Sequence, residues 1–375
     1  MPRGAGGIDL VRAGGGMDRI GHAAEGAAVL GVDLGAIVAN WRSLAARAAP
    51  AVCAAVVKAD AYGLGAEHVA PALARAGCRQ FFVAHPAEGV ALRRVLGAGP
   101  GIAVLHGPPP GGAPAFAAHD LLPVLNSLAQ AEAWAAFDAA RPCILQIDSA
   151  MHRLGVPAEE LGHLPALPGL LLVMSHLACA DTPSHPANAA QLAAFRARAG
   201  RWPDVPRSLA ASSGIFLGPD WHFDLVRPGA ALYGLAPAPG ANPMRPVLRL
   251  QAPVVQTRVV PAGDGVGYGH AWHAAAPARI ATLAIGYADG LPRSLGGHGA
   301  VWLDGQRLPL VGRVSMDSVT VDVSALPEEA VRPGTLLDLI GPDCDADALA
   351  AAGGTIGYEL LTRLGRRFRR RYAGG

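Results

Sequence analysis

The feature that most constrains the fold is a regular alternation of short apolar runs with alanine-rich stretches. Eight apolar runs lie at residues 53–57, 81–84, 102–106, 121–125, 143–148, 171–176, 208–212 and 223–226. Stretches of helical composition lie between several of them, at 66–77, 86–96, 128–140 and 187–200. Parallel strands with crossover helices produce this alternation, and eight such strands close a (β/α)8 barrel. We therefore predict an N-terminal (β/α)8 TIM-type barrel over residues 29–245.

The pattern changes near residue 245. Beyond it, β-forming segments separated by glycine- and proline-bearing turns lie at 253–260, 279–285, 301–303, 318–323 and 336–340. This arrangement predicts a C-terminal β-domain over residues 246–375. Residues 1–28 are glycine-rich and lack the apolar core of a signal peptide, so we expect a disordered extension, with translation starting at Met1 or Met17.

Composition excludes several classes of protein. The sequence is 51% hydrophobic with a formal net charge of +2, which is typical of a globular chain and gives no reason to expect a nucleic-acid partner. No charge-free apolar stretch is long enough to cross a bilayer, so no membrane association is expected. Five scattered cysteines without a CxxC pair argue against disulfides and a zinc site and favour a cytoplasmic location. The arginines between residues 366 and 371 are interpreted as a solvated segment making salt bridges rather than as a phosphate or nucleic-acid patch.

Reactive side chains lie where the predicted strands end. Five of the eight runs are followed by such groups: Lys58, Arg153, His176, Ser213 and Arg227. The carboxyl ends of barrel strands form the active-site face, so these groups are expected to share one mouth. A lysine at such a strand end is partly desolvated, which lowers its pKa and frees its amine to bond covalently to a carbonyl compound. The alternative is a rim lysine that extends its ammonium group into water.

Two turns near the last strands are rich in small residues. They are Ser212-Ser213-Gly214 and the stretch 227–230. Loops at this place in a barrel commonly bind phosphate through backbone N–H groups, but ordinary turns use the same residues, so the spacing leaves both readings open. The glycine-rich stretch 263–269 does not match a dinucleotide-binding fingerprint. His270 and His273 are interpreted as a surface pair, and no metal site is expected.

At residues 54–65 the sequence AAVVKADAYGLG resembles the cofactor-lysine signature of the alanine racemase family. Seven further motifs match that family in order: MHRLG at 151–155, SHL at 175–177, VRPGAALYG at 226–234, VGYG at 266–269, IGYADG at 285–290, GRVSMD at 312–317 and YE at 358–359. The resemblance covers nearly the whole chain from residue 30. It implies a pyridoxal-phosphate-dependent enzyme that interconverts L- and D-alanine and supplies D-alanine for peptidoglycan. It also implies a homodimer with shared active sites.

The resemblance assigns roles to individual residues. Lys58 would carry pyridoxal 5'-phosphate covalently and act as one base, and Tyr268, delivered by the partner subunit, would be the opposite base. The phosphate would be held by Tyr62, Ser213, Gly229, Ala230 and Tyr358. On the cofactor ring, Arg227 would hydrogen-bond the pyridine nitrogen. Arg153 and Met316 would contact the substrate carboxylate. His176 would link Tyr268 to the cofactor, and Tyr287 would narrow the access route.

The chemistry of racemisation calls for residues of these types. A proton leaves one face of a carbon and another returns on the opposite face, so two bases must flank that carbon. A tyrosine has an ordinary pKa near 10, so Tyr268 needs nearby cations such as Arg153 to act as a base. Arginine stays protonated, so Arg227 cannot give its proton to the ring nitrogen, and this limits side reactions such as transamination.

Three positions depart from the family pattern. A modified lysine often lies seven residues before the Arg153 position, and here that residue is Gln146. Ser149-Ala150 replaces a usual Thr-Gly, and Leu64 replaces a common histidine. The first departure removes a negative charge that would orient Arg153, although the amide of Gln146 could still hydrogen-bond it.

Other functions remain open at this point. A serine or broad-specificity racemase is poorly excluded by sequence. A related amino-acid decarboxylase shares the architecture but normally places an acid where Arg227 stands. A cofactor-binding regulatory protein would resemble the barrel alone, without the second domain that carries Tyr268.

Overall fold

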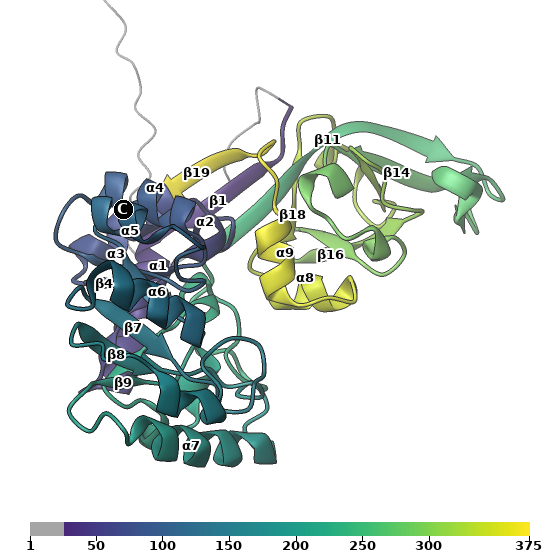
Figure 1. Ribbon diagram of the computed structural model, residues 1–375. Coiled ribbons are helices and arrows are strands. Elements are labelled where there is room, and N and C mark those ends of the chain that lie inside the picture. Colours follow the sequence, from purple (N-terminus) through teal and green to yellow (C-terminus); the bar gives the residue numbers. More distant parts are fainter. Residues whose placement is uncertain (1–25) are drawn as a thin grey trace, which may run out of the picture.

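The computed structural model describes residues 26–375. Residues 1–25, which hold most of the expected extension and Met17, lie outside the described residues. The chain forms two lobes, a barrel and a β-rich unit, bridged by long strands (Figure 1).

The first lobe is a closed parallel barrel. Seven strands pair in sequence order in one sheet: β3 (Ala55–Val56), β4 (Gln80–Val83), β5 (Gly101–Val104), β6 (Leu122–Leu125), β7 (Cys143–Gln146), β8 (Leu170–Met174) and β9 (Arg207–Ser208). β10 (Leu225–Val226) pairs with β2 (Val52–Cys53), and a parallel bridge joins Ala211 to Arg227. These contacts close the ring, so the prediction of eight parallel strands is confirmed.

Helices surround the barrel where helical composition predicted them. The four expected stretches form α3 (Ala66–Arg75), α4 (Pro86–Leu96), α6 (Leu128–Asp138) and α7 (Pro186–Ala199), joined by α1 (Leu34–Ala48) and α5 (Ala113–Ala118). Capping fixes where several of them begin: Ser127 Oγ accepts a hydrogen bond from the Gln130 N–H at the start of α6, and Pro86 occupies the first turn of α4. The strand ends therefore face one mouth while the helices shield the outside.

The second lobe is built on an eight-stranded sheet, which confirms the predicted C-terminal β-domain. Its order is β14-β17-β16-β15-β18-β11-β1-β19, and β14 also pairs with β11. The strands in this part of the chain are β11 (Leu248–Val260), β14 (Ala278–Leu283), β15 (Ala300–Leu303), β16 (Gln306–Val311), β17 (Val319–Asp322) and β18 (Leu336–Ile340). A small hairpin of β12 (Gly265–Val266) and β13 (Trp272–His273) and two helices, α8 (Ala346–Ala352) and α9 (Gly357–Arg363), complete the lobe.

Two strands in this sheet come from unexpected parts of the chain. β1 (Val29–Asp33) pairs antiparallel with β11 and parallel with β19 (Arg369–Ala373), and Figure 1 shows β1 and β19 side by side. The range expected for the barrel thus begins with a strand of the other lobe, and we propose that the domain division falls near residue 245. The expectation for the arginine tail holds in part: Arg366 and Arg367 are exposed and Arg367 makes salt bridges, but residues 369–373 form a strand rather than a solvated segment. The backbone of these residues is paired in β19, and Arg370 donates to the Gly63 and Gly365 carbonyl oxygens.

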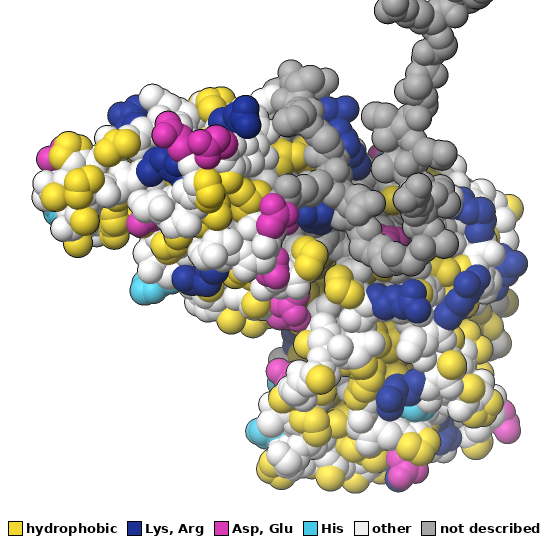
Figure 2. Space-filling model, turned by 180° about the vertical axis from the view of Figure 1, so that it is seen from behind, with side chains coloured by type: hydrophobic (Ala, Val, Ile, Leu, Met, Phe, Trp, Pro, Cys, Tyr) yellow, Lys and Arg dark blue, Asp and Glu magenta, His cyan; other side chains and the backbone are white. Residues whose placement is uncertain are grey.

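On the face seen from behind, no large patch of a single charge sign stands out among the described side chains. Lys and Arg side chains are interspersed with acidic and apolar ones, and a broad recess lies beside the barrel under the second lobe (Figure 2). Within residues 26–375, no helix is long and apolar enough to span a membrane, and no three His, Cys, Asp or Glu side chains form a candidate metal site. All five cysteines are free.

Candidate active site

The carboxyl ends of the barrel strands carry the predicted barrel residues. Lys58 follows β3 and opens α2 (Lys58–Tyr62), Ser213 opens the short helix η2 (Ser213–Phe216), and Arg227 follows β10. Because all these strands are parallel, the side chains converge on the active-site face. The structure thus brings together groups that are up to 169 residues apart in the sequence, between Lys58 and Arg227.

A cavity of about 180 Å³ lies between these strand ends and α9 of the second lobe. It is lined by the side chains predicted around the cofactor and its phosphate, namely Tyr62, His176, Ser213, Arg227, Gly229, Ala230 and Tyr358. Ser212 Oγ accepts hydrogen bonds from the N–H groups of Gly229 and Ala231, at 3.0 and 3.1 Å, and so fixes the turn before η4 (Ala230–Tyr233). The turn, the two hydroxyls of Tyr62 and Ser213 and the start of η4 form a polar cup.

Gly229 allows the backbone to approach Tyr62 closely. A Cβ at this position would lie 2.3 Å from the Tyr62 hydroxyl oxygen, so no side chain fits without moving that ring. Tyr62 is itself held from the other side, since its ring packs on Tyr233 with centroids 4.7 Å apart. The hydroxyl is therefore fixed at the wall of the cavity.

Arg227 is buried at the base of the cavity. Its guanidinium donates to the Ser175 carbonyl oxygen at 2.6 Å and to the Ser208 hydroxyl, and it lies 3.5 Å from His176 Nδ1. Burial lowers the pKa of Arg227 to about 10, which still leaves it charged at neutral pH. Burial, reinforced by the charges of Arg227 and Arg153, lowers the pKa of His176 to about 3, so the imidazole is neutral.

Lys58 is followed by an unusual backbone turn. Ala59, Asp60, Ala61 and Tyr62 all have φ between 53° and 56°, the left-handed region. Each such residue costs about 1–2 kcal/mol, so the surroundings must hold the turn in place. It brings Lys58 and the Tyr62 hydroxyl to the same mouth within five residues. Burial lowers the pKa of Lys58, the Arg153 charge lowers it further, and Glu88 opposes both.

The surroundings of Arg153 differ from the expectation. Gln146 is buried at the end of β7, but no hydrogen bond joins its side chain to Arg153. The residue before Arg153 is tied down instead, since His152 Nδ1 lies 3.0 Å from Asp148 Oδ2 and its N–H donates to Asp148 Oδ1. These bonds fix the loop at the residue before Arg153.

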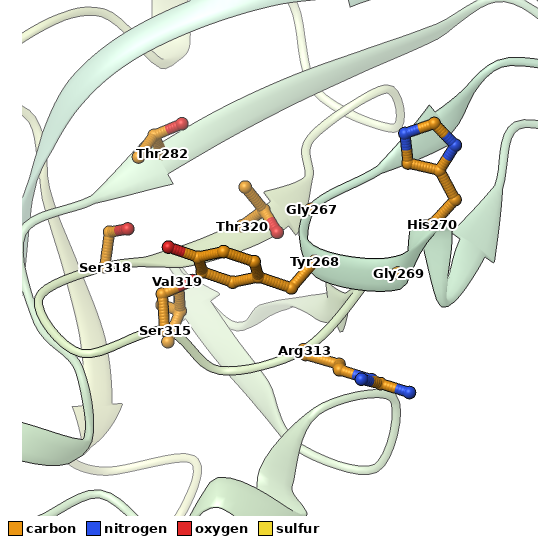
Figure 3. A pocket seen from close by; sticks show the side chains of 10 residues that line it. All are labelled: Gly267, Tyr268, Gly269, His270, Thr282, Arg313, Ser315, Ser318, Val319 and Thr320. Carbon is orange, nitrogen blue, oxygen red and sulfur yellow. The ribbon is translucent and has the colours of Figure 1, made fainter.

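The second-lobe residues lie away from the barrel cavity of the same chain, except for Tyr358. Tyr268, Met316 and Tyr287 are 71%, 54% and 40% exposed, and none of them lines the cavity beside Arg227. Tyr268 lies in η5 (Tyr268–His270) at a separate cavity of about 700 Å³, with Arg313 and Thr320 among its lining residues. Figure 3 shows the Tyr268 ring across this cavity with its hydroxyl directed toward Ser318. One chain alone thus does not bring Lys58 and Tyr268 together.

Two ion-pair and hydrogen-bond clusters were missed by sequence reasoning. Arg367 binds both carboxylate oxygens of Asp289, at 2.8 and 2.9 Å, and Asp317 at 2.6 Å. It thereby ties together the two loops that carry Tyr287 and Met316. Glu88, at the start of α4, binds the peptide after Lys58. A glutamate at the third position of a helix is a common capping signal, and that signal was available in the sequence.

Comparison with known proteins identifies the family. The sequence model described as "Alanine racemase, N-terminal domain" matches residues 32–237, and "Alanine racemase, C-terminal domain" matches residues 247–372. The chain belongs to the alanine racemase family.

Relatives and solved structures agree along most of their length. The chain is 53% identical to "Alanine racemase, catabolic" of Mesorhizobium japonicum, over 95% of this chain and 96% of that protein. It is 50% identical to "Alanine racemase" of Rhodospirillum rubrum, over 95% and 98%. Among solved structures, the alanine racemase from Bartonella henselae with covalently bound pyridoxal phosphate superposes with a TM-score of 0.88 at 42% identity, covering 92% of this chain and 99% of that one.

The residues of this alanine racemase family member fit pyridoxal 5'-phosphate. The cup around Gly229 offers hydroxyls and backbone N–H groups to a phosphate. Because Gly229 has no side chain, the phosphate oxygens can approach its backbone and the Tyr62 hydroxyl. Arg227 offers a donor to a ring nitrogen, and Lys58, with its lowered pKa, offers an amine to an aldehyde. At the base of the cup the Arg227 guanidinium donates to neutral acceptors, and the one acid among the described residues that line the cavity is Asp181.

Replacing Gly229 with alanine is expected to weaken cofactor binding by about tenfold or more. The new Cβ would displace the Tyr62 hydroxyl, and a hydrogen bond to a charged group contributes about 1.5–3 kcal/mol. Equilibrium titration with pyridoxal phosphate measures the effect. Gly218→Ala is not a suitable control because its φ is positive, but Gly162→Ala is, since a Cβ there meets nothing within 4 Å. Unchanged cofactor affinity in Gly229→Ala would contradict the assigned contact.

Proposed function

We propose that this chain is a pyridoxal-phosphate-dependent enzyme that interconverts L- and D-alanine. The observation that carries the proposal is a polar cavity lined by Arg227 and His176 at the barrel mouth, with Lys58 close enough to interact electrostatically with His176, in a chain matched by both domains of the family. When bound, the cofactor withdraws electrons from the substrate and so acidifies its Cα–H. The protein then has only to hold the substrate and to move protons on two faces.

Within this proposal, Lys58 moves the proton on one face of Cα and Tyr268 on the other. The lowered pKa of Lys58 leaves more of its amine free to accept a proton near neutral pH. Arg227 stays charged and keeps its proton, which limits electron withdrawal and so favours racemisation over transamination. His176 is neutral in this environment, so it lies beside the Arg227 guanidinium without adding a second positive charge.

The proposal includes a homodimer with sites shared across the interface. Tyr268, Tyr287 and Met316 are exposed on the second lobe, and the recess beside the barrel offers space for that lobe of a second copy (Figure 2). A two-fold dimer places the same patch of each copy against the other, so both sites would be completed at once. Tyr268 and Tyr287 of the partner would then approach Lys58 and Arg153.

Substrate range is expected to be narrow, with alanine preferred over serine and with leucine and lysine rejected. Tyr358 lines the cavity, and Tyr287 would narrow it from the partner, so a larger side chain meets aromatic rings. A missing methylene changes binding by only about 1–3 kcal/mol, whereas steric overlap discriminates more strongly. The substrate range is tested by measuring kcat/KM for L-alanine, L-serine, L-leucine and L-lysine through chiral analysis of the products, with and without bicarbonate. Because Gln146 cannot carry a carbamate, bicarbonate should have no effect. Leucine or lysine turned over as well as alanine would favour a broad-specificity racemase.

The physiological direction has two candidates. We propose supply of D-alanine for peptidoglycan, and the catabolic designation of the Mesorhizobium japonicum relative favours breakdown of alanine as the second. A deletion strain that requires D-alanine for growth supports the first. A deletion strain that needs no D-alanine but fails to grow on alanine as carbon source supports the second. A cytoplasmic location and the lack of nucleic-acid or membrane partners remain predictions.

A further inference from the structure

The Glu88 carboxylate binds the backbone of two neighbouring segments, the turn that follows β3 and the end of β4. Its Oε1 accepts a hydrogen bond from the N–H of Ala59, at 2.7 Å. Its Oε2 accepts from the N–H groups of Ala84 and His85, at 2.7 and 3.0 Å, where β4 ends. One carboxylate thus ties the peptide directly after Lys58 to the end of the neighbouring strand.

The position of Glu88 is itself fixed by the fold. It occupies the first turn of α4, and His85 is the residue that precedes this helix. A carboxylate at this place favourably meets the unpaired N–H groups and the positive end of the helix. Glu88 is therefore ordered before any ligand binds, and it can act as a fixed anchor for the loop of Lys58.

The tie matters because the loop is strained. The four residues after Lys58 all have left-handed backbone, and none of them is glycine. Asp60 Oδ1 accepts from the Ala66 N–H at 2.7 Å and fixes the far end of the turn, while Glu88 fixes its beginning. Without the Glu88 contact, Ala59 is free to leave the left-handed region, and the direction of the Lys58 side chain changes with it.

Glu88 also supplies charge. The groups that interact electrostatically with Lys58 are Glu88, Arg153, His106 and His176. Arg153 is cationic, the two histidines carry no negative charge, and Glu88 is the one acid among these described groups. Since Arg153 lowers the pKa of Lys58 and Glu88 raises it, Glu88 is the group that limits how far the amine is shifted.

We propose that Glu88 is a positioning residue for Lys58, which both fixes the peptide after the lysine and places a negative charge beside that peptide. The inference rests on the proposed role of Lys58 as cofactor lysine and base. In the proton-transfer steps, Glu88 favours the protonated amine after Lys58 has taken a proton, without touching the substrate.

The test uses Glu88→Gln in the cofactor-free protein. The pH dependence of Lys58 labelling by an amine-reactive reagent, followed by peptide mass analysis, gives the pKa of this amine. Loss of the negative charge is expected to lower that pKa, so that labelling at neutral pH becomes several-fold faster. Glu67→Gln is the matched control, because it removes an equal charge from an exposed side chain of α3 that makes no contact with the Lys58 loop. The pKa and the labelling rate of Lys58 should stay unchanged in this variant.

A second variant separates charge from shape. Glu88→Asp keeps the charge but shortens the reach, so the pKa of Lys58 should stay closer to that of the unaltered protein than in Glu88→Gln, even where both variants melt at a lower temperature. If Asp and Gln variants titrate alike, or if Glu88→Gln lowers only the melting temperature, Glu88 is merely structural and the inference is wrong.

Borohydride reduction of the unaltered holoenzyme distinguishes failure of the Glu88 inference from failure of the proposed function. A cofactor adduct on Lys58, together with unchanged titration in Glu88→Gln, overturns the role of Glu88 alone. Because Lys58 is the one lysine of the sequence, cofactor-loaded protein that yields no adduct on Lys58 overturns both.

Discussion

Mixing Lys58→Ala protein with Tyr268→Ala protein is expected to restore racemase activity that neither protein has alone. Each parent lacks one base at every site, and loss of a general acid–base group costs about 10²–10⁴-fold in rate. In a mixed dimer, the barrel of the Tyr268→Ala chain keeps Lys58 and receives Tyr268 from the other chain. One of its two sites is then intact.

The amount of recovery is itself a test. Random exchange makes about half of the dimers mixed, so about a quarter of all sites should hold both bases. The structure motivates this expectation because Tyr268 lies at its own cavity, apart from the one beside Arg227. Steady-state racemisation before and after exchange measures it, and native mass analysis of differently tagged chains reports the exchange independently.

A double variant supplies the control. Mixing Lys58→Ala protein with the Lys58→Ala, Tyr268→Ala protein gives dimers without any Lys58, so no activity should return. Full exchange in the first mixture without recovered activity would mean that Lys58 and Tyr268 do not meet across subunits.

Replacing Arg227 with glutamate is expected to slow racemisation on the order of 10²-fold or more and to change its side reactions. A carboxylate beside the ring nitrogen favours protonation of that nitrogen, which strengthens electron withdrawal and prolongs the lifetime of the deprotonated substrate. Pyruvate formation through transamination should therefore increase. A new long-wavelength absorption band during turnover is also expected.

Arg227→Gln is the matched control for this substitution. Both variants lose the donors to the Ser175 carbonyl oxygen and the Ser208 hydroxyl, so both lose stability and rate. Only the glutamate brings a group that can share a proton with the ring. Pyruvate and the absorption band should appear with Glu and not with Gln. Equal behaviour of the two variants would show that Arg227 does not set the protonation state of the ring.

The barrel and its mouth were predictable because their signals are local. Each strand is a short apolar run, and a reactive residue after such a run lies at the same face as its counterparts in every parallel strand. Lys58, Ser213 and Arg227 could be placed in this way, although their sequence positions are far apart.

Other features depend on partners that no local pattern specifies. The run at 29–33 has the same apolar character as a barrel strand, but its partner in β11 lies more than 200 residues later in the sequence. Composition predicts a solvated arginine tail, whereas the backbone of β19 is paired with β1 and the Arg370 side chain donates to backbone carbonyl oxygens. The Gln146 amide was chemically able to bond Arg153, but no such bond forms, and the bonds between His152 and Asp148 that fix this loop have no local sequence signal.

The placement of β1 between β11 and β19 has a consequence for biosynthesis. β1 leaves the ribosome early, yet both of its neighbours are made later, and β19 only after residues 369–373 have been added. Contacts so distant in sequence form slowly, since a long loop must close first. The barrel strands can pair while translation continues, but the eight-stranded sheet of the lobe that carries Tyr268 cannot be finished until nearly the whole chain exists. A nascent chain therefore exposes an unpaired β1 until β11 has been made, and the edge that receives β19 stays open until synthesis is nearly complete. This edge is where a chaperone would protect the chain from aggregation.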